Sequence, residues 1–268
     1  MWHAMSKIER IGIGVYGLCI VLVMIDIRLS TIPLACFLVV CLGAPFFPAA
    51  GFFLPTISHG ISGKNAVAIT FDDGPDPATT PDLLNLLARH GVPATFFVTG
   101  RHVDAYPDLV DKILSNGHSV GNHTYSHDNL VMLKSRQTLY KEIEAAQRAL
   151  MPFGIRPMVF RPPVGITNPR LWQVLRAFNM VHLAFSCRAG DFGNRRIWKL
   201  SERILKRVRP DDIIILHDVS PKNPTARNEW LAEIDRIIIG LQKQGIAVLP
   251  LSELIGRPVM VRESRVPS

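Results

Sequence analysis

Beyond residue 60, short apolar runs alternate with longer segments of helical periodicity. Seven runs have the composition of strands, at 66–71, 94–98, 118–121, 158–160, 181–185, 212–216 and 246–249. Helical segments are expected over 79–90, 106–116, 134–150, 168–178, 197–208 and 228–244. Because strands that alternate with helices form parallel sheets, the pattern predicts an α/β fold, specifically a distorted (β/α)7-type barrel, closed or nearly closed.

Polar residues follow the ends of most of these predicted strands. The carboxylates Asp72 and Asp73 come after the first strand, His123 after the third and Arg161 after the fourth. Asp191 follows the fifth strand and His217 the sixth. Barrel enzymes build their sites at the carboxyl ends of strands. We therefore expect these residues to meet in one site.

The adjacent carboxylates Asp72 and Asp73 also predict a cation. Two like charges at the end of a buried strand are unfavourable unless they share a cation or a proton. Fifty residues later, His123 and His127 stand at i and i+4, a spacing that a helical turn would place on one face, about 6 Å apart. An aspartate with two histidines is a plausible open metal site.

The N-terminal segment has a different composition. Two apolar runs, 11–27 and 32–54, are each close to the ~20 residues that a membrane-spanning helix needs. Asp26 and Arg28 interrupt them where a turn would lie. We expect residues 1–60 to be a membrane anchor, folded as a transmembrane helical hairpin. A single span and a cleaved secretory signal are the alternatives.

This interpretation predicts an integral protein of the cell membrane, with its main domain close to the membrane surface. Lys7 and Arg10 precede the first apolar run, which favours a cytoplasmic N-terminus, and a hairpin would return the domain to the same side. A single span would place the domain outside.

The charge balance narrows the choice of partners. Residues 1–60 hold three basic and two acidic side chains, so basic side chains exceed acidic ones by seven in the rest of the chain. Residues 257–268 are expected to form a basic tail. This surplus suggests contact with anionic lipid or a phosphate-bearing substrate, or only a solvated basic surface. Nucleic acid is not an expected partner, because no aromatic-basic interleaving or known binding motif is present.

Four motifs, in order, resemble those of the polysaccharide deacetylases, a metal-dependent group of carbohydrate esterases with a NodB-homology domain. The resemblance covers about residues 65 to 250, within a catalytic domain expected over 61–256. The motifs are Thr70-Phe71-Asp72-Asp73-Gly74, His123-Thr124-Tyr125-Ser126-His127, Arg161-Pro162-Pro163-Val164-Gly165 and Leu216-His217-Asp218.

The resemblance implies a role for each site residue. Asp73, His123 and His127 would hold a divalent ion, most often zinc. Asp72 would be the general base, kept charged and oriented by Arg161, and His217 would be the general acid. A backbone N–H in the turn of residues 163–165 would stabilise the oxyanion. Asp191 is also expected in the site, although what tunes His217 is left open.

Two positions depart from the family pattern. Where members commonly carry Asp-x-x-Asp-Trp, this chain reads Arg188-Ala189-Gly190-Asp191-Phe192. Val164 also replaces a common aromatic residue. The exchange at Val164 should not affect hydrogen-bond donation by the backbone N–H groups of this turn. Arg188 either binds a phosphate or carboxylate of the substrate or points away from the site.

The expected function is hydrolysis of the N-acyl group, acetyl or formyl, of an amino sugar in a lipid-linked or envelope glycan. An O-acetyl polysaccharide esterase is the alternative within the enzyme class. An inactive relative that binds glycan or acts as a scaffold, and an amidase for non-sugar amides, are further alternatives. No G-x-S-x-G motif is evident, which disfavours a serine hydrolase mechanism.

Overall fold

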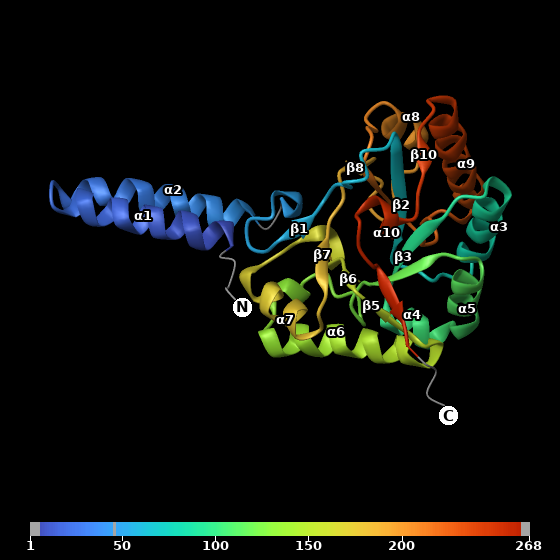
Figure 1. Ribbon diagram of the computed structural model, residues 1–268, viewed down its shortest axis with the longest axis horizontal. Coiled ribbons are helices and arrows are strands. Elements are labelled where there is room, and N and C mark those ends of the chain that lie inside the picture. Colours follow the sequence, from blue (N-terminus) through green and yellow to red (C-terminus); the bar gives the residue numbers. More distant parts are fainter. Residues whose placement is uncertain (1–5, 45–46, 264–268) are drawn as a thin grey trace.

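The protein is an α/β structure built on one curved sheet. The computed structural model describes residues 6–44 and 47–263 (Figure 1). The strands of the large sheet are β1 (Thr56–Ile57), β2 (Ala66–Asp72), β3 (Ala94–Val98), β4 (Ser119–Asn122), β6 (Val159–Phe160), β7 (Val181–Leu183), β8 (Cys187–Arg188), β9 (Ile213–His217) and β10 (Ala247–Val248). Every strand predicted from the apolar runs is therefore present.

Helices connect these strands and cover the sheet. They are α3 (Thr80–His90), α4 (Gly100–Ala105), α5 (Pro107–Ser115), α6 (Arg136–Leu150), α7 (Pro169–Ala177), α8 (Leu200–Leu205), α9 (Arg227–Lys243) and α10 (Leu251–Leu254). Helices α3, α5 and α9 lie together on one outer side of the molecule (Figure 1). The main hydrophobic core lies between these helices and the sheet, and it buries Phe71 of β2, Leu87 of α3 and Trp230 of α9.

The sheet is parallel but does not close into the predicted barrel. Its strands pair in the order β1-β7-β6-β4-β3-β2-β9-β8, and β10 pairs with the start of β2. Within the described ranges, β1 pairs only with β7 and β8 only with β9, so the two ends of the order remain apart. The expectation of a parallel α/β fold is confirmed, whereas the barrel is a curled half-barrel. Strands β1 and β8 were not predicted from the sequence.

The N-terminal segment is a helical hairpin, as expected, but its helices are not transmembrane. Helices α1 (Lys7–Val23) and α2 (Ile27–Gly43) have 17 residues each and project together from the rest of the molecule (Figure 1). At 1.5 Å per residue, each is about 25 Å long, which is shorter than the ~30 Å hydrocarbon core of a bilayer. Across residues 6–44 and 47–263, no helix combines the length and apolar character needed to cross a membrane. The prediction of an integral membrane protein is therefore wrong.

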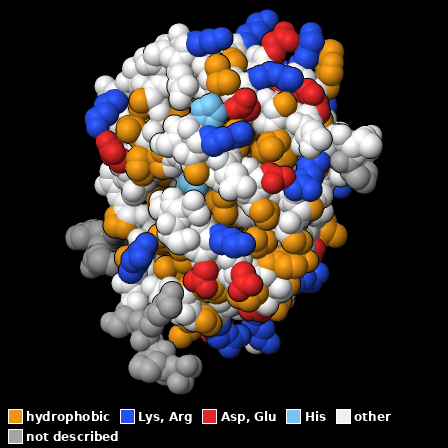
Figure 2. Space-filling model, turned by 90° about the vertical axis from the view of Figure 1, so that its right-hand side faces the viewer, with side chains coloured by type: hydrophobic (Ala, Val, Ile, Leu, Met, Phe, Trp, Pro, Cys, Tyr) orange, Lys and Arg blue, Asp and Glu red, His pale blue; other side chains and the backbone are white. Residues whose placement is uncertain are grey.

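The segment expected to be a basic tail begins with ordered structure. Strand β11 (Met260–Arg262) pairs antiparallel with β5 (Ile155–Pro157), and residues 264–268 lie outside the described part. On the face shown in Figure 2, basic and acidic side chains are interspersed and do not gather in one basic patch. This face therefore offers no concentrated charge to a polyanion.

Candidate active site

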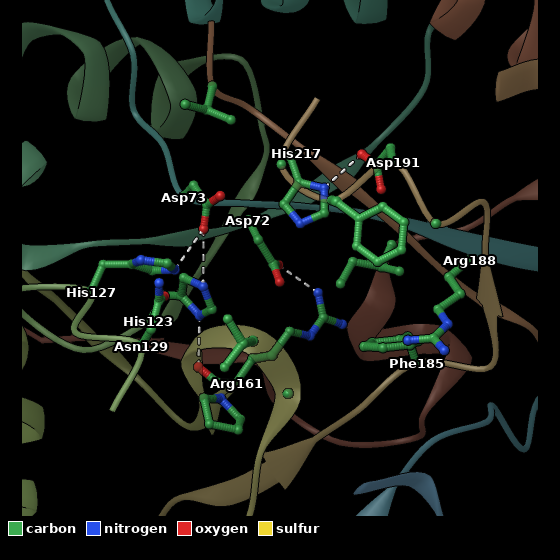
Figure 3. Close-up of a pocket in the computed structure, with 18 of the residues that line it drawn as sticks. Asp72, Asp73, His123, His127, Asn129, Arg161, Phe185, Arg188, Asp191 and His217 are labelled. Carbon is green, nitrogen blue, oxygen red and sulfur yellow. Dashed lines mark hydrogen bonds and ion pairs between the residues drawn. The ribbon is translucent and has the colours of Figure 1, made fainter. Parts of the chain in front are cut away.

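All seven predicted site residues line one open pocket at the carboxyl ends of the strands (Figure 3). The cavity has a volume of about 490 Å³, within the ~300–1,000 Å³ that is usual for small-ligand sites. Asp72 ends β2 and His217 ends β9, and the two residues are paired in register. His123 directly follows β4, and Arg161 directly follows β6. The parallel sheet thus brings together side chains that lie far apart in the sequence.

Asp72 and Arg161 form a buried ion pair. The Arg161 Nη1 atom lies 2.6 Å from Asp72 Oδ1, and Arg161 is only 1% exposed. The same guanidinium donates to Thr70 Oγ1 at 2.8 Å and to the carbonyls of Leu183 and Ala184 at 3.3 and 3.0 Å. Burial lowers the pKa of Arg161, and the Asp72 carboxylate opposes this effect. The carboxylate is therefore held in one orientation by a cation that is itself fixed by hydrogen bonds.

Asp73, His123 and His127 form a cluster with the donor set of a metal site. Asp73 Oδ1 lies 3.3 Å from His123 Nε2 and 3.0 Å from His127 Nε2, and ligand atoms of the three residues lie within 4.8 Å of one another. Burial by itself raises the pKa of Asp73, but hydrogen bonds from His123 and His127 outweigh it and hold this pKa well below its usual range. The cluster can hold a divalent cation, as the sequence predicted.

One hydrogen bond prepares His123 for coordination. Its Nδ1 lies 2.7 Å from the backbone oxygen of Arg161, an acceptor, so Nδ1 carries the proton. Nε2, the nitrogen that faces Asp73, would then offer its lone pair to a cation that takes the place of the proton shared with Asp73. Metal-binding histidines are commonly oriented in this way by a hydrogen bond from the other ring nitrogen. The residues present therefore fit a metal.

The two histidines are not on a helix, contrary to the prediction from their spacing. Residues 123–128 form an irregular loop in which Thr124 and His127 have φ of 66° and 55°. Glu142 of α6 holds this loop: its Oε2 accepts hydrogen bonds from the Tyr125 and Ser126 N–H groups at 3.2 and 2.8 Å. The loop brings the two imidazole rings within 5.0 Å, centroid to centroid. Sequence analysis missed Glu142, since nothing in the sequence links it to a loop 16 residues away.

His217 and Asp191 form a second pair across the pocket from the cluster (Figure 3). His217 Nδ1 lies 2.7 Å from Asp191 Oδ2, which leaves Nε2 available to a substrate. Burial lowers the pKa of His217, but the hydrogen bond and charge of Asp191, with the charges of Asp73 and Asp72, raise it to about 9. The Asp191 carboxylate therefore favours the protonated imidazole. This contact identifies Asp191 as the partner of His217, which the sequence left open.

Three residues outside the pocket lining support the site, namely Asn194, His102 and Asp218. Asn194 donates to the carbonyls of His217 and Val219 at 3.0 and 2.7 Å and so fixes the end of β9. His102 donates from Nδ1 to the Asp73 carbonyl at 3.0 Å. Asp218 is fully buried and accepts hydrogen bonds from the hydroxyl groups of Thr79 and Thr80. Burial raises the pKa of Asp218 to about 7.

The turn that follows Arg161 is also at the pocket. Within the turn Pro163–Gly165, Val164 has a φ of 52° and lies 59% exposed in the pocket lining. Gly165 N–H donates to the Pro162 carbonyl at 3.1 Å, and Pro163 has no N–H, so Val164 is the donor that the turn can offer to a substrate.

Comparisons with known proteins agree with this fold. The polysaccharide deacetylase family model matches residues 59–183. A chitooligosaccharide deacetylase from Bradyrhizobium sp. (strain ANU 289) is 31% identical over 204 residues, which cover 72% of this chain and 92% of the relative. The fold and the site define a hydrolase of the α/β class, with a cluster of residues that can hold a metal ion.

Solved structures are similar over the same region. The crystal structure of the Bc1960 peptidoglycan N-acetylglucosamine deacetylase has a TM-score of 0.69 and 28% identity, and the match covers 76% of this chain and 94% of that one. A mutant of BA3943, a CE4 family pseudoenzyme with restored enzymatic activity, has a TM-score of 0.66 and 26% identity, with coverage of 75% and 71%. The chain belongs to the polysaccharide deacetylase family and is a hydrolase of carbon–nitrogen bonds other than peptide bonds.

Proposed function

We propose that this protein removes the N-acetyl group from an amino sugar, of the N-acetylglucosamine type, in an envelope or lipid-linked glycan. One observation carries the proposal: a single open pocket combines the metal-type cluster, the Asp72–Arg161 pair and the His217–Asp191 pair. Hydrolysis of an amide needs a base for water, stabilisation of negative charge on oxygen and a proton for the leaving amine. The pocket has a group for each need.

Asp72 is the general base in this proposal. Its fixed carboxylate lies beside the cluster and accepts the proton of the attacking water, while Arg161 keeps it ionised and oriented. The Val164 N–H donates to the carbonyl oxygen as it becomes negative. His217, held protonated by Asp191, donates its proton from Nε2 to the departing amine.

Asp73, His123 and His127 hold the metal in this proposal. Two imidazole nitrogens and one carboxylate oxygen are a donor set that suits zinc and leaves positions open for ligands. A divalent ion bound there supplies Lewis acidity toward the acyl carbonyl and lowers the pKa of bound water.

The relatives support the choice of sugar. The Bradyrhizobium protein is a chitooligosaccharide deacetylase and the Bc1960 protein is a peptidoglycan N-acetylglucosamine deacetylase, so both names describe N-acetylated amino-sugar polymers. An N-formyl group would fit the same chemistry.

We further propose that residues 61–256 form the catalytic domain and that the hairpin within residues 1–60 is separate from it.

The test is acyl release by the full chain. Zinc-loaded protein is incubated with N-acetylglucosamine oligomers, N-formyl analogues and their undecaprenyl-linked forms, and free acetate or formate is measured. We expect release by the native chain and at least about a hundredfold loss in Asp72→Asn, because a positioned base contributes roughly 10²–10⁴-fold. His123→Ala should lose both activity and stoichiometric metal.

The control is Asp235→Asn, an exposed carboxylate paired with His90 on the surface, which should keep full activity. The BA3943 structure shows that the family fold also occurs in a pseudoenzyme. Stoichiometric metal with no acyl release from any of these sugars would overturn the proposed function in favour of an inactive glycan-binding protein. Release only from O-acetyl esters would favour the esterase alternative.

A further inference from the structure

The pocket contains two arginines that the proposed reaction does not use, Arg188 and Arg195. Both line the pocket and both side chains are exposed. Arg188 is the last residue of β8, and Arg195 lies in the loop that follows Asp191. Across the described ranges 6–44 and 47–263, neither arginine forms an ion pair. The cavity therefore holds two cations whose charge the protein does not neutralise by direct pairing.

The other charged groups of the pocket are already paired. Asp72 pairs with Arg161, and Asp191 pairs with His217. Asp73 faces His123 and His127. Arg188 thus differs from Arg161, whose guanidinium is buried and donates to a carboxylate, a hydroxyl and two carbonyls. The donors of Arg188 remain free for a ligand.

A ring contact holds Arg188 in place. Its guanidinium carbon lies 5.8 Å from the centroid of the Phe185 ring, and the guanidinium carbon of Arg161 lies 5.9 Å from the same ring. In Figure 3, Arg188 and Phe185 occupy the side of the pocket opposite His127, with Arg161 between them. Stacking on an aromatic ring orients a guanidinium without using its N–H donors. The side chain is therefore positioned in advance of binding.

The sequence places a cation close to the site residues at this position. Arg188 begins the run Arg188-Ala189-Gly190-Asp191-Phe192, and Asp191 of this run pairs with His217 in the same pocket. A planar guanidinium with free donors matches the paired oxygens of a carboxylate or phosphate. A neutral glycan would gain little from this cation, whereas an anionic one would gain a charge-assisted contact.

We propose that Arg188 binds an anionic oxygen group of the substrate, a carboxylate or a phosphate, next to the acylated sugar. This inference rests on the proposed function, because the acyl group must then lie at Asp72 and the metal-type cluster. Since Arg188 lies across the pocket from His127, the anionic group belongs to another substituent or to the neighbouring unit of the glycan.

The test compares matched neutral and anionic substrates. For the carboxylate, the zinc-loaded full chain is given a neutral N-acetylglucosamine tetramer or a tetrasaccharide in which glucuronate alternates with N-acetylglucosamine. For the phosphate, the pair is the methyl glycoside and the 1-phosphate of N-acetylglucosamine. We expect kcat/KM to favour the anionic member of at least one pair by about tenfold or more, as for a hydrogen bond to a charged group. The responsive pair identifies the anion.

In Arg188→Ala, this preference should fall to less than about threefold, mainly through KM, and Arg188→Lys should restore part of it. The matched control is Arg89→Ala, an exposed arginine on α3 outside the pocket lining, which should keep the native preference. An equal loss on the neutral and anionic substrates in Arg188→Ala would show a merely structural role and would overturn the proposal. A native preference for the neutral substrates would also overturn it.

A binding measurement separates this inference from the proposed function. The same saccharides are titrated calorimetrically into metal-free native protein, which keeps Arg161 paired with Asp72. Tighter binding of an anionic saccharide, lost in metal-free Arg188→Ala, supports the subsite even if the native chain releases no acyl group. Equal affinity of the native chain and Arg188→Ala for every anionic saccharide overturns it.

Discussion

At the scale of single residues, the site solves the problem of its adjacent carboxylates by giving each a different partner. The sequence suggested that Asp72 and Asp73 share one cation. In the structure, Asp72 faces Arg161 and Asp73 faces the two histidines. Asp72 is the last residue of β2 and Asp73 follows it with a φ of 76°, so the two carboxylates face different partners although both line the pocket. Each carboxylate can therefore have its own function.

The His217–Asp191 pair predicts a pH dependence. Asp191→Asn removes the charge that raises the pKa of His217 to about 9, so this pKa should fall. A general acid loses activity when it is deprotonated, and the alkaline limb of kcat/KM should therefore move to lower pH. The measurement is a pH profile of acyl release. Asp235→Asn, which breaks the surface His90–Asp235 pair, should leave the limb in place. An unchanged limb in Asp191→Asn would contradict the role given to Asp191.

The same pair should contribute to stability in the metal-free protein. The pKa of His217 is raised in the folded state from 6.5 to about 9. The contribution of the His217–Asp191 pair to the free energy of unfolding is therefore fully present below pH 6.5 and is lost as the pH rises through about 9. Urea unfolding at several pH values should show this loss in the native chain and a weaker pH dependence in Asp191→Asn. Equal pH dependence of the two proteins would count against the pair.

At the scale of elements, the metal-type cluster depends on close packing between the histidine loop and helices α4 and α6. Gly100 begins α4, and its N–H donates to the Thr124 carbonyl at 2.9 Å. A Cβ at Gly100 would meet the Tyr125 ring and would lie 2.9 Å from the Cα of Ala146 in α6. There is no room for a methyl group between these elements.

Gly100→Ala should therefore displace the histidine loop. Overpacking of this kind costs about 1–3 kcal/mol, and Tyr125 lies between the two histidines of the cluster. We expect a lower melting temperature and weaker zinc affinity, measured by thermal unfolding and by competition with a chelator. The matched control is Gly17→Ala in α1, where nothing lies within 4 Å of the added methyl group. Native zinc affinity in Gly100→Ala would show that the loop does not depend on this packing.

At the scale of the whole molecule, the N-terminal hairpin makes few contacts with the α/β unit. Neither α1 nor α2 has a buried residue. At the base of the hairpin, Ile8 N–H donates to the Phe52 carbonyl at 3.0 Å, and Lys7 Nζ donates to the Ala50 carbonyl at 2.6 Å. The core of the α/β unit is formed without the hairpin helices, apart from partial burial of Ile8 near Leu54 and its neighbours.

Removal of residues 1–46 should leave the α/β unit folded. The lost base contacts are few, so we expect the melting temperature to change by less than about 5 °C, on the scale of 1 kcal/mol. Thermal unfolding and zinc affinity of the two chains are the measurements. As a control within the shortened chain, Leu54→Ala removes a buried side chain and should cost about 2–5 kcal/mol. Loss of cooperative unfolding on deletion would show that the hairpin belongs to the same folding unit.

The amino-acid sequence was sufficient to predict the α/β class of fold and the family. Apolar runs report burial directly, so all seven predicted strands are present, from β2 to β10. The motifs also led to seven predicted site residues, and all seven line one pocket in the structure. The order of those motifs along the chain was sufficient to indicate the family.

The pairing of the strands, the partners of the site residues and the lengths of the hairpin helices became known only from the three-dimensional structure. The sequence did not predict that the sheet stays open, because strand pairing at the edges depends on contacts between distant strands. Local periodicity carries no information about these contacts. His123 and His127 meet through a loop held by Glu142, and Asp191 is paired with His217 from 26 residues away. The hairpin was predicted but its helices end after 17 residues, short of a membrane span. Local pattern records which residues are buried, whereas partners, distances and directions arise only when the whole chain packs.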